Sequence, residues 1–218
     1  MTRIRLLIAL ITGLAVALTL VVVDIATGFV TGGTSTAVTA TAPGAGAEEG
    51  TGEPAPEFAE PPTGRYVGTS DDGGFTVAVI MWDTDVVAYV TDGQSNAAWL
   101  TGVYEGDGTL SLSGDGEAGL TASYDQGSFI GTAYRGGWVV RFSVPEVQAP
   151  AGIYRASGET NNGVPVAFGL IVLPDESQTG LEWVDGEPGA APAWDLSEAS
   201  IDHEGTAFQV KPVQPGDV

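Results

Sequence analysis

From Gly64 onward, apolar and polar residues alternate with a period of two, and Gly or Asp residues interrupt the pattern every eight to twelve residues or so. The alternation places apolar side chains on one face of a strand, and no stretch shows the 3.6-residue period of an amphipathic helix. The interruptions have the composition of tight hairpin turns. The pattern predicts about eight antiparallel strands, in the ranges 66–70, 75–81, 87–91, 98–104, 110–112, 120–124, 129–133 and 138–144.

Beyond Val144 the pattern is less regular. Pro145 and Pro150 have no amide hydrogen for a neighbouring strand, so they should interrupt the ladder and introduce a longer connection. Strands are then expected at 152–155, 164–173 and 181–184, a loop at 187–192, and a last hairpin at 199–210. Residues 211–218 are expected to fray. The start of this part, Gly152-Ile153-Tyr154-Arg155, echoes Gly64-Arg65-Tyr66-Val67. The echo is either a degenerate repeat or two hairpins that obey the same rules, and we favour the second.

Small residues alternate with large ones along the inward face of several predicted strands. Gly102 adjoins Leu100, and Gly131 and Ala133 adjoin Phe129. That alternation suits a small tapered barrel, and closure removes exposed strand edges. The predicted fold is all-β, an antiparallel meander that forms a small up-and-down β-barrel or barrel-like sandwich. It occupies 64–214, with a short tail at 215–218.

The N-terminal segment has a different pattern. Leu6–Val23 is eighteen uncharged, mostly apolar residues preceded by Arg3 and Arg5. As a helix the run would cover about 27 Å, close to the hydrocarbon thickness of a bilayer. Positive charge on the N-terminal side predicts a cytoplasmic N-terminus and an exported C-terminal part. Residues 1–26 are therefore a signal anchor, which gives a single-pass cell-membrane protein, or a signal peptide cleaved near Ala26-Thr27-Gly28, which gives a secreted one.

Residues 27–63 are dominated by Gly, Thr, Ala, Pro and Glu. Such a composition cannot bury enough apolar surface to offset the entropy lost on ordering. It predicts a disordered stalk between the membrane and an extracytoplasmic β-domain.

Charge and cysteine content exclude several functions. The chain has 28 acidic and 7 basic residues, and only five of the basic residues follow Val23. A strongly acidic surface repels phosphate backbones, so no nucleic-acid partner is expected. The chain has no cysteine. Disulfides, zinc thiolate sites, thiol nucleophiles and a lipid-modified N-terminal cysteine are therefore excluded.

The parts of the common hydrolytic sites are scarce. The single histidine, His203, falls in a predicted surface turn beside Glu204 and is expected to be solvated. No Gly-x-Ser-x-Gly motif occurs. The carboxylate pairs that could serve a glycosidase lie in predicted turns, where Asp serves local backbone hydrogen bonds; they are Asp71 with Asp72, Asp83 with Asp85, and Asp175 with Glu176. No catalytic residue is assigned, and we lean against an enzyme.

Two Gly-Asp-Gly turns, Gly106-Asp107-Gly108 and Gly114-Asp115-Gly116, lie eight residues apart with Glu117 adjoining. Calcium-binding glycine-rich repeats recur every nine residues over many copies. We interpret the turns as the two ends of one short strand and assign no metal ligand, although calcium at the acidic turns stays an open alternative.

Exposed tryptophans on a sheet can form carbohydrate platforms. Trp138 shares the apolar phase of its strand and is predicted to lie in the core. Trp82 and Trp99 have the opposite phase and are predicted to lie at the rim or surface. Trp183 and Trp194 complete the set of five.

Four segments of the chain together carry a family resemblance: Ala88-Tyr89-Val90-Thr91-Asp92-Gly93, Ala98-Trp99-Leu100, Ala151-Gly152-Ile153-Tyr154-Arg155, and Leu170-Ile171-Val172-Leu173-Pro174-Asp175. The chain resembles exported, membrane-anchored or lipid-anchored β-rich proteins of actinobacteria. The resemblance implies an envelope location. In that group a Cys is expected where Thr91 stands, so no disulfide or thiol role carries over.

These observations favour a non-catalytic, envelope-tethered β-domain that binds a ligand or partner outside the cytoplasm. The partner would be an envelope protein or glycan, the domain a monomer, and no cofactor is expected. The ligand-binding residues stay unknown at this level. The alternatives are a carboxylate-dependent hydrolase of envelope carbohydrate, and a structural spacer or adhesion module.

Overall fold

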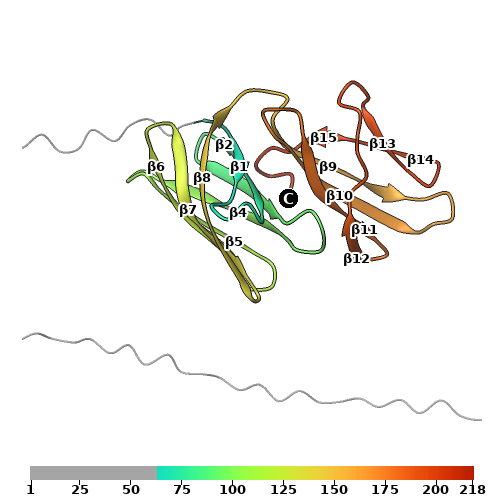
Figure 1. The fold of residues 1–218 in the computed structure, drawn as a ribbon, viewed down its shortest axis with the longest axis horizontal. Helices are drawn as coiled ribbons and strands as arrows, with labels where there is room; N and C mark the ends of the chain where they lie inside the picture. The colour runs from blue at the N-terminus through green and yellow to red at the C-terminus, as the bar shows by residue number, and fades with distance from the viewer. Residues whose placement is uncertain (1–62) are drawn as a thin grey trace, which may run out of the picture. The chain divides into compact units, whose positions relative to one another are not determined.

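The computed structural model describes residues 63–218, and this part of the chain is all-β (Figure 1). Its first eight strands form a closed antiparallel barrel, as the alternating pattern predicted. The barrel strands are β1 (Gly64–Thr69), β2 (Thr76–Trp82), β3 (Asp85–Thr91), β4 (Ala97–Glu105), β5 (Thr109–Gly114), β6 (Ala118–Asp125), β7 (Ser128–Arg135) and β8 (Trp138–Val147). Strand β5 joins the two Gly-Asp-Gly turns, so their interpretation as strand ends is confirmed.

Every strand of the barrel pairs with the next one along the chain, and β1 closes the barrel against β8. The closing ladder is short, with Arg65 opposite Val147 and Tyr66 opposite Glu146. Pro145 does not interrupt the ladder with β7, where it lies opposite Ser128. On the other side of β8 the ladder to β1 does stop next to Pro145, at Glu146, and only an isolated bridge between Ser70 and Phe142 follows.

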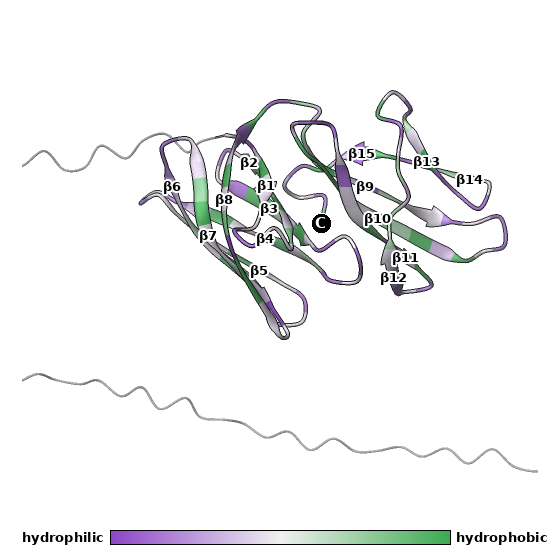
Figure 2. Ribbon diagram, in the orientation of Figure 1, coloured by the Kyte–Doolittle hydropathy of each residue, from purple (hydrophilic) through white to green (hydrophobic). Residues whose placement is uncertain are grey.

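Large apolar side chains fill the barrel interior. Phe129, Phe142, Leu100 and Leu120 are buried there among the β-branched residues of β2 and β8. Hydrophobic and hydrophilic residues are interleaved along the barrel strands (Figure 2). The predicted small positions adjoin the neighbouring backbone: a Cβ at Gly131 would lie 2.2 Å from the Thr121 carbonyl oxygen. The barrel is therefore a packed core, and its glycines allow the strands to curl tightly.

The chain beyond the barrel forms a second, five-stranded sheet in the order β12-β11-β10-β9-β15, and the separate hairpin β13-β14 lies between β12 and β15 along the chain. The predicted hairpin at 199–210 is confirmed. These strands are β9 (Gly152–Glu159), β10 (Pro165–Val172), β11 (Gln178–Val184), β12 (Glu187–Ala190), β13 (Ser200–His203), β14 (Thr206–Gln209) and β15 (Lys211–Pro212).

Two expectations for this part were wrong. The predicted loop at 187–192 contains β12, which pairs with β11, and the predicted fraying tail contains β15, which pairs with β9. Val213, just after β15, is only 3% exposed. Both segments have too few alternating apolar residues to register as strands, and they are ordered because β9 and β11 offer them unpaired edges.

The second sheet packs against the outside of the barrel. Val67, Ile80 and Tyr89 of the barrel share a buried cluster with Ile153 and Ile171 of the sheet. The approach is close, since a Cβ at Gly169 would lie 2.8 Å from the Tyr89 ring and 2.9 Å from the Trp99 ring. Strands β2 and β3 are consequently buried on both faces. A third cluster, which includes Phe168, Ile201 and Phe208, holds the β13-β14 hairpin onto the sheet.

No helix within residues 63–218 has the length and apolar character needed to cross a membrane. The predicted membrane helix at Leu6–Val23 and residues 27–62 of the predicted stalk lie outside the described residues.

Candidate functional site

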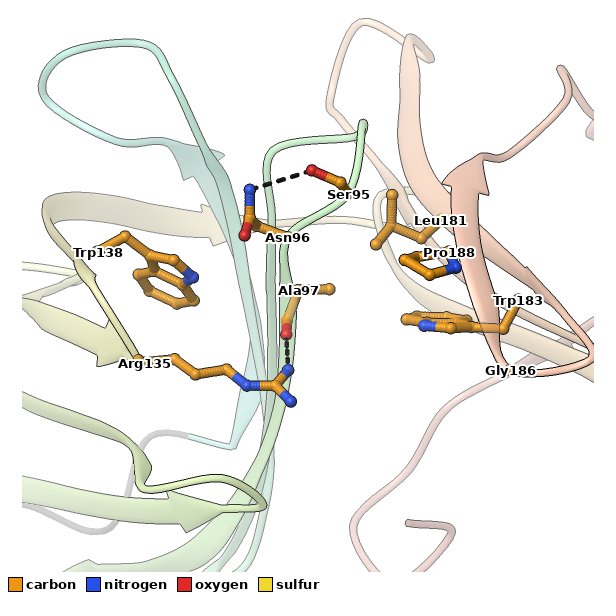
Figure 3. Close-up of a pocket in the computed structure, with 10 residues that line it drawn as sticks. Ser95, Asn96, Ala97, Arg135, Trp138, Leu181, Trp183, Gly186 and Pro188 are labelled. Carbon is orange, nitrogen blue, oxygen red and sulfur yellow. Dashed lines mark hydrogen bonds between the residues drawn. The ribbon is translucent and has the colours of Figure 1, made fainter.

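A half-open pocket of about 360 Å³ lies where the barrel meets the second sheet. Three separate connections build it: the β3-β4 loop, the β7-β8 hairpin and the β11-β12 hairpin (Figure 3). Its lining residues are Ser95, Asn96, Ala97, Arg135, Gly136, Trp138, Leu181, Trp183, Gly186 and Pro188.

Asp92 fixes the β3-β4 loop. Its Oδ1 accepts hydrogen bonds from the backbone N–H groups of Gln94 at 2.8 Å, Ser95 at 2.9 Å and Asn96 at 2.9 Å. Its Oδ2 accepts one from Asn96 Nδ2 at 2.6 Å. Partial burial opposes ionisation of Asp92, but these hydrogen bonds outweigh it and lower the pKa of the carboxyl. Ser95 and Asn96 are therefore held at the pocket by an ionised aspartate.

Thr91 supports the same loop from its base. Its hydroxyl donates to the Asn96 carbonyl oxygen at 3.1 Å and accepts from the Gly93 N–H at 3.0 Å. Thr91 is fully buried. The Thr91 hydroxyl therefore acts as both donor and acceptor. A cysteine thiol at this position would form both hydrogen bonds only weakly.

Arg135 is the single charged residue that lines the pocket. It ends β7, and its guanidinium Nη1 donates to the Ala97 carbonyl oxygen at the start of β4 (Figure 3). The side chain is half-buried, and within residues 63–218 no carboxylate lies within 4.0 Å of it. A guanidinium carries five N–H donors, so one hydrogen bond leaves most of its donor capacity unused.

Trp138 and Trp183 stand on opposite sides of the pocket (Figure 3). Trp138 begins β8, and its ring lies 4.9 Å from the Phe75 ring and packs on the barrel core. Trp138 is half-buried. One side of its ring lies on the core, as predicted, and the residue also lines the pocket. Trp183, on β11, packs against the cluster between barrel and sheet, opposite Pro188 of β12.

The other tryptophans lie elsewhere. Trp82 is 65% exposed at the end of β2, as its phase predicted. Trp99 was expected at the rim or surface, but it is half-buried and stacks on Tyr89 with the ring centroids 4.3 Å apart. Its phase was correct, and it points out of the barrel; the second sheet covers that side. Trp194 is buried in the third cluster and donates to the Glu198 carbonyl oxygen at 2.9 Å.

The predicted carboxylate pairs do not form a catalytic arrangement. Asp71 and Asp72 adjoin one exposed pocket, where Asp71 Oδ2 lies 3.8 Å from Arg141 Nε. Asp72 Oδ1 accepts hydrogen bonds from Ser70 Oγ at 2.6 Å and from the Gly74 N–H at 3.0 Å, and the Ser70 bond above all lowers the pKa of Asp72. Asp175 has the same arrangement with Ser177, and the pKa of its carboxyl is lowered too.

No Asp or Glu among residues 63–218 is buried. The acidic turns do not converge either, since this part of the chain holds no group of three or more His, Asp or Glu side chains that could bind a metal ion. Asp107, in the first Gly-Asp-Gly turn, accepts instead from the Thr109 hydroxyl at 2.7 Å and from its N–H at 2.9 Å.

His203 is not solvated as expected. Its side chain is 13% exposed, and Nδ1 lies 3.0 Å from Glu182 Oε2 on β11. The ring also makes an edge contact with Phe168. The β13-β14 hairpin packs on the second sheet, so His203 contacts that sheet and links the hairpin to it. His203 therefore has a packing role and lies outside the pocket.

No protein-family model matches the chain, and no curated protein and no solved structure shows significant similarity to it. The class of the protein is therefore given by its own geometry: an eight-stranded barrel with a second sheet packed on its outside and a pocket at their junction.

Proposed function

We propose that the folded part of this protein is a non-catalytic binding domain, held as a monomer outside the cytoplasmic membrane by its N-terminal segment. The ligand is an envelope component that enters the pocket between barrel and second sheet. The observation that carries the proposal is the pocket itself, in which two half-buried tryptophans flank a half-buried arginine without a carboxylate partner. Concave sites with aromatic walls and a few convergent polar groups are typical of ligand binding.

The carboxyl groups argue against the alternative of a carbohydrate hydrolase. A glycosidase needs one carboxyl whose pKa is raised by burial, so that it can donate a proton near neutral pH. In residues 63–218 the carboxyl groups with clear shifts all have lowered pKa values, as at Asp92, Asp107 and Asp195. They are ionised and engaged in turn hydrogen bonds, which suits structure and not acid catalysis.

The pocket also argues against a plain spacer. A spacer or adhesion module without a ligand would require neither a cavity nor aromatic walls. Here the loop with Ser95 and Asn96 is held by four hydrogen bonds to one aspartate, which fixes the position of polar groups at the pocket rim. Preorganisation of that kind lowers the entropic cost of binding.

The proposal is tested by cosedimentation of the full chain, in detergent, with isolated bacterial cell walls at high salt, which suppresses nonspecific charge effects. We expect the protein to sediment with the walls, and Trp183→Ala to reduce the bound fraction several-fold. Trp82→Ala is the matched control, because it removes an exposed tryptophan outside the pocket and should bind normally. Equal loss in both variants, or no binding of the parent protein, would refute the proposal.

Tethering is tested separately by membrane fractionation and mass spectrometry of the mature N-terminus. An anchored protein stays with the membranes and retains Leu6–Val23. A mature chain that starts at Phe29 would show that the segment is cleaved and that the protein is secreted.

A further inference from the structure

The charge in the pocket is opposite in sign to the net charge of the chain. The chain carries a formal net charge of −21, yet the pocket lining contains one arginine and no acid. Arg141, by comparison, is exposed and lies 3.8 Å from Asp71. Arg135 is half-buried and spends its one hydrogen bond on a neutral carbonyl oxygen, that of Ala97. A half-buried guanidinium with free N–H donors binds an anion more strongly than a guanidinium at the surface would, because the surrounding dielectric is lower.

The surroundings limit which anion can bind. Asp185 and Glu187 lie beside Gly186 in the β11-β12 hairpin, and Asp92 lies at the base of the opposite loop. These acids would repel a densely charged polymer such as a polyphosphate. A ligand with one carboxylate can make a strong, charge-assisted hydrogen bond to Arg135. The rest of that ligand must be uncharged, because the nearby acids would repel further negative charge.

The walls indicate the shape of the uncharged part. Trp183 supplies an aromatic wall on the side of the second sheet, Trp138 lies beyond Ala97 and Arg135 on the barrel side, and Asn96 and Ser95 add polar groups at the rim (Figure 3). A flat aromatic wall with polar neighbours fits a body with an apolar face and hydroxyl edges, which is the character of a sugar ring. The pocket volume of about 360 Å³ lies at the lower end of the range for small-molecule sites, roughly 300 to 1,000 Å³, and so suits one or two rings.

We propose that the pocket binds a carboxylate-bearing sugar unit, a uronic acid residue of a glycan. Its carboxylate pairs with the Arg135 guanidinium and its ring packs on Trp183. This inference rests on the proposed binding function and adds the ligand class.

The test uses the full chain in detergent and three matched probes: digalacturonate, its dimethyl ester and the neutral disaccharide galactobiose. The probes share the same ring pair and differ at the carboxylate. Calorimetry or tryptophan fluorescence should show that digalacturonate binds at least about tenfold more tightly than the other two, because they cannot pair with the guanidinium. This comparison needs no mutation, so it holds whether or not a pocket variant folds.

Substitution gives a second, independent arm. Arg135→Gln should reduce digalacturonate affinity to that of the neutral probe, and Arg135→Lys should restore it only in part because it lacks the planar fork. Arg141→Gln is the matched control and should bind as the parent does. A circular-dichroism melting curve for each variant confirms that the fold is retained.

The outcomes separate the two proposals. Equal affinity for the acid, ester and neutral probes overturns the ligand class, and so does an undiminished affinity of Arg135→Gln. If no probe binds but the parent protein still sediments with cell walls in a Trp183-dependent manner, the ligand class fails and the binding function stands. If wall binding is also absent, both fail.

Discussion

Two tyrosines bury their hydroxyl groups in different parts of the fold. Tyr66 lies inside the barrel, where its ring meets those of Phe129 and Tyr124 at centroid distances of 4.7 and 6.1 Å. Tyr89 lies between barrel and sheet, where its hydroxyl is buried near the Thr91 side chain and the Leu181 backbone without a well-formed hydrogen bond. Burial raises the pKa of both phenols well above the usual value, and at Tyr66 the neighbouring Tyr124 and Glu146 raise it further.

Alkaline pH should therefore destabilise the protein. Both phenols stay neutral in the native state and ionise in the unfolded chain above about pH 10, so the free energy of unfolding falls as pH rises through that value. Each phenol that stays protonated should account for about 1.4 kcal/mol of that loss by pH 11. Urea unfolding at pH 9 and pH 11 measures the effect.

Tyr89→Phe should remove its share of the alkaline loss with little effect on the fold at pH 7, because no well-formed hydrogen bond is given up. Tyr134→Phe, at a site 45% exposed, is the control. An unchanged alkaline slope in Tyr89→Phe would show that Tyr89 ionises normally.

The Asp92 carboxylate organises one wall of the pocket, so its substitution should affect both stability and binding. Asp92→Ala removes the acceptor of three backbone N–H groups and should cost about 1 to 2 kcal/mol, a modest value because the loop is largely exposed. Because the pKa of Asp92 is lowered in the native state, its contribution is present above about pH 4 and is lost as pH falls below it.

Asp92→Asn is the informative comparison for that loop. It retains an oxygen at the Oδ1 position, so it should keep part of the stability while losing the acid dependence between about pH 5 and pH 3. Thermal unfolding at pH 7 and pH 4 distinguishes the variants. Loss of stability in Asp92→Ala without any change in cell-wall binding would separate the loop from the pocket.

At the scale of elements, the barrel could be predicted because all but one of its pairings join consecutive strands. Short Gly and Asp turns mark each reversal, and the inward phase of every strand follows from alternation. Strands β2 and β3 also carry a sequence signal for the second sheet. Their residues 76–81 and 86–91 are apolar, small or Thr without interruption, and this indicates burial on both faces and therefore a covering layer outside the barrel.

Inward glycines should be essential to the curl of the barrel. A Cβ at Gly131 would lie 2.2 Å from the Thr121 carbonyl oxygen and 2.6 Å from Ala122 Cβ, so strands β6 and β7 would have to separate. We expect Gly131→Ala to lower the free energy of unfolding by about 1 to 3 kcal/mol. Denaturant unfolding measures the change.

Gly106→Ala is the matched control for this prediction. Nothing lies within 4 Å of a Cβ at Gly106, and the residue does not have a positive φ angle. Its effect should stay within about 0.5 kcal/mol. Similar costs at the two glycines would contradict the steric account of the barrel.

At the scale of the whole molecule, the pocket depends on how the barrel and the second sheet pack together. Local sequence patterns do not predict that packing. Arg135 and Asn96 come from two barrel connections that are distant in sequence, and Trp183 joins them only when the second sheet docks. The sequence did show that Arg135 is one of few basic residues and sits beside a Gly-Gly turn and Trp138. The same docking explains why the phase of Trp99 was right and its expected exposure was wrong.

Docking of the sheet should be sensitive to a single methyl group at the contact. Gly169→Ala places a Cβ 2.8 Å from the Tyr89 ring and 2.9 Å from the Trp99 ring, which should push the sheet from the barrel and cost about 1 to 3 kcal/mol. Calorimetry should show a single transition in the parent and a broader or split transition in the variant. Binding to cell walls should weaken as well.

Gly189→Ala, in the same sheet, is the control, because the nearest atom to its Cβ would be Glu182 Cγ at 3.9 Å. It should unfold and bind as the parent does. A Gly169→Ala protein with unaltered unfolding and binding would mean that barrel and sheet are not coupled.

The short ladder between β1 and β8 affects the order in which the barrel folds. Seven of the eight pairings in the barrel join neighbours in the sequence, so each hairpin can form as soon as its second strand is available. The closing contact joins the first strand to the last and must wait for the whole barrel segment. If the exported part emerges from its N-terminal end onward, while residues 1–26 stay at the membrane, β1 emerges earliest and keeps one edge unpaired until β8 follows. The slowest step of folding should then be this closure, and the β1 edge is the surface that an export chaperone would have to protect.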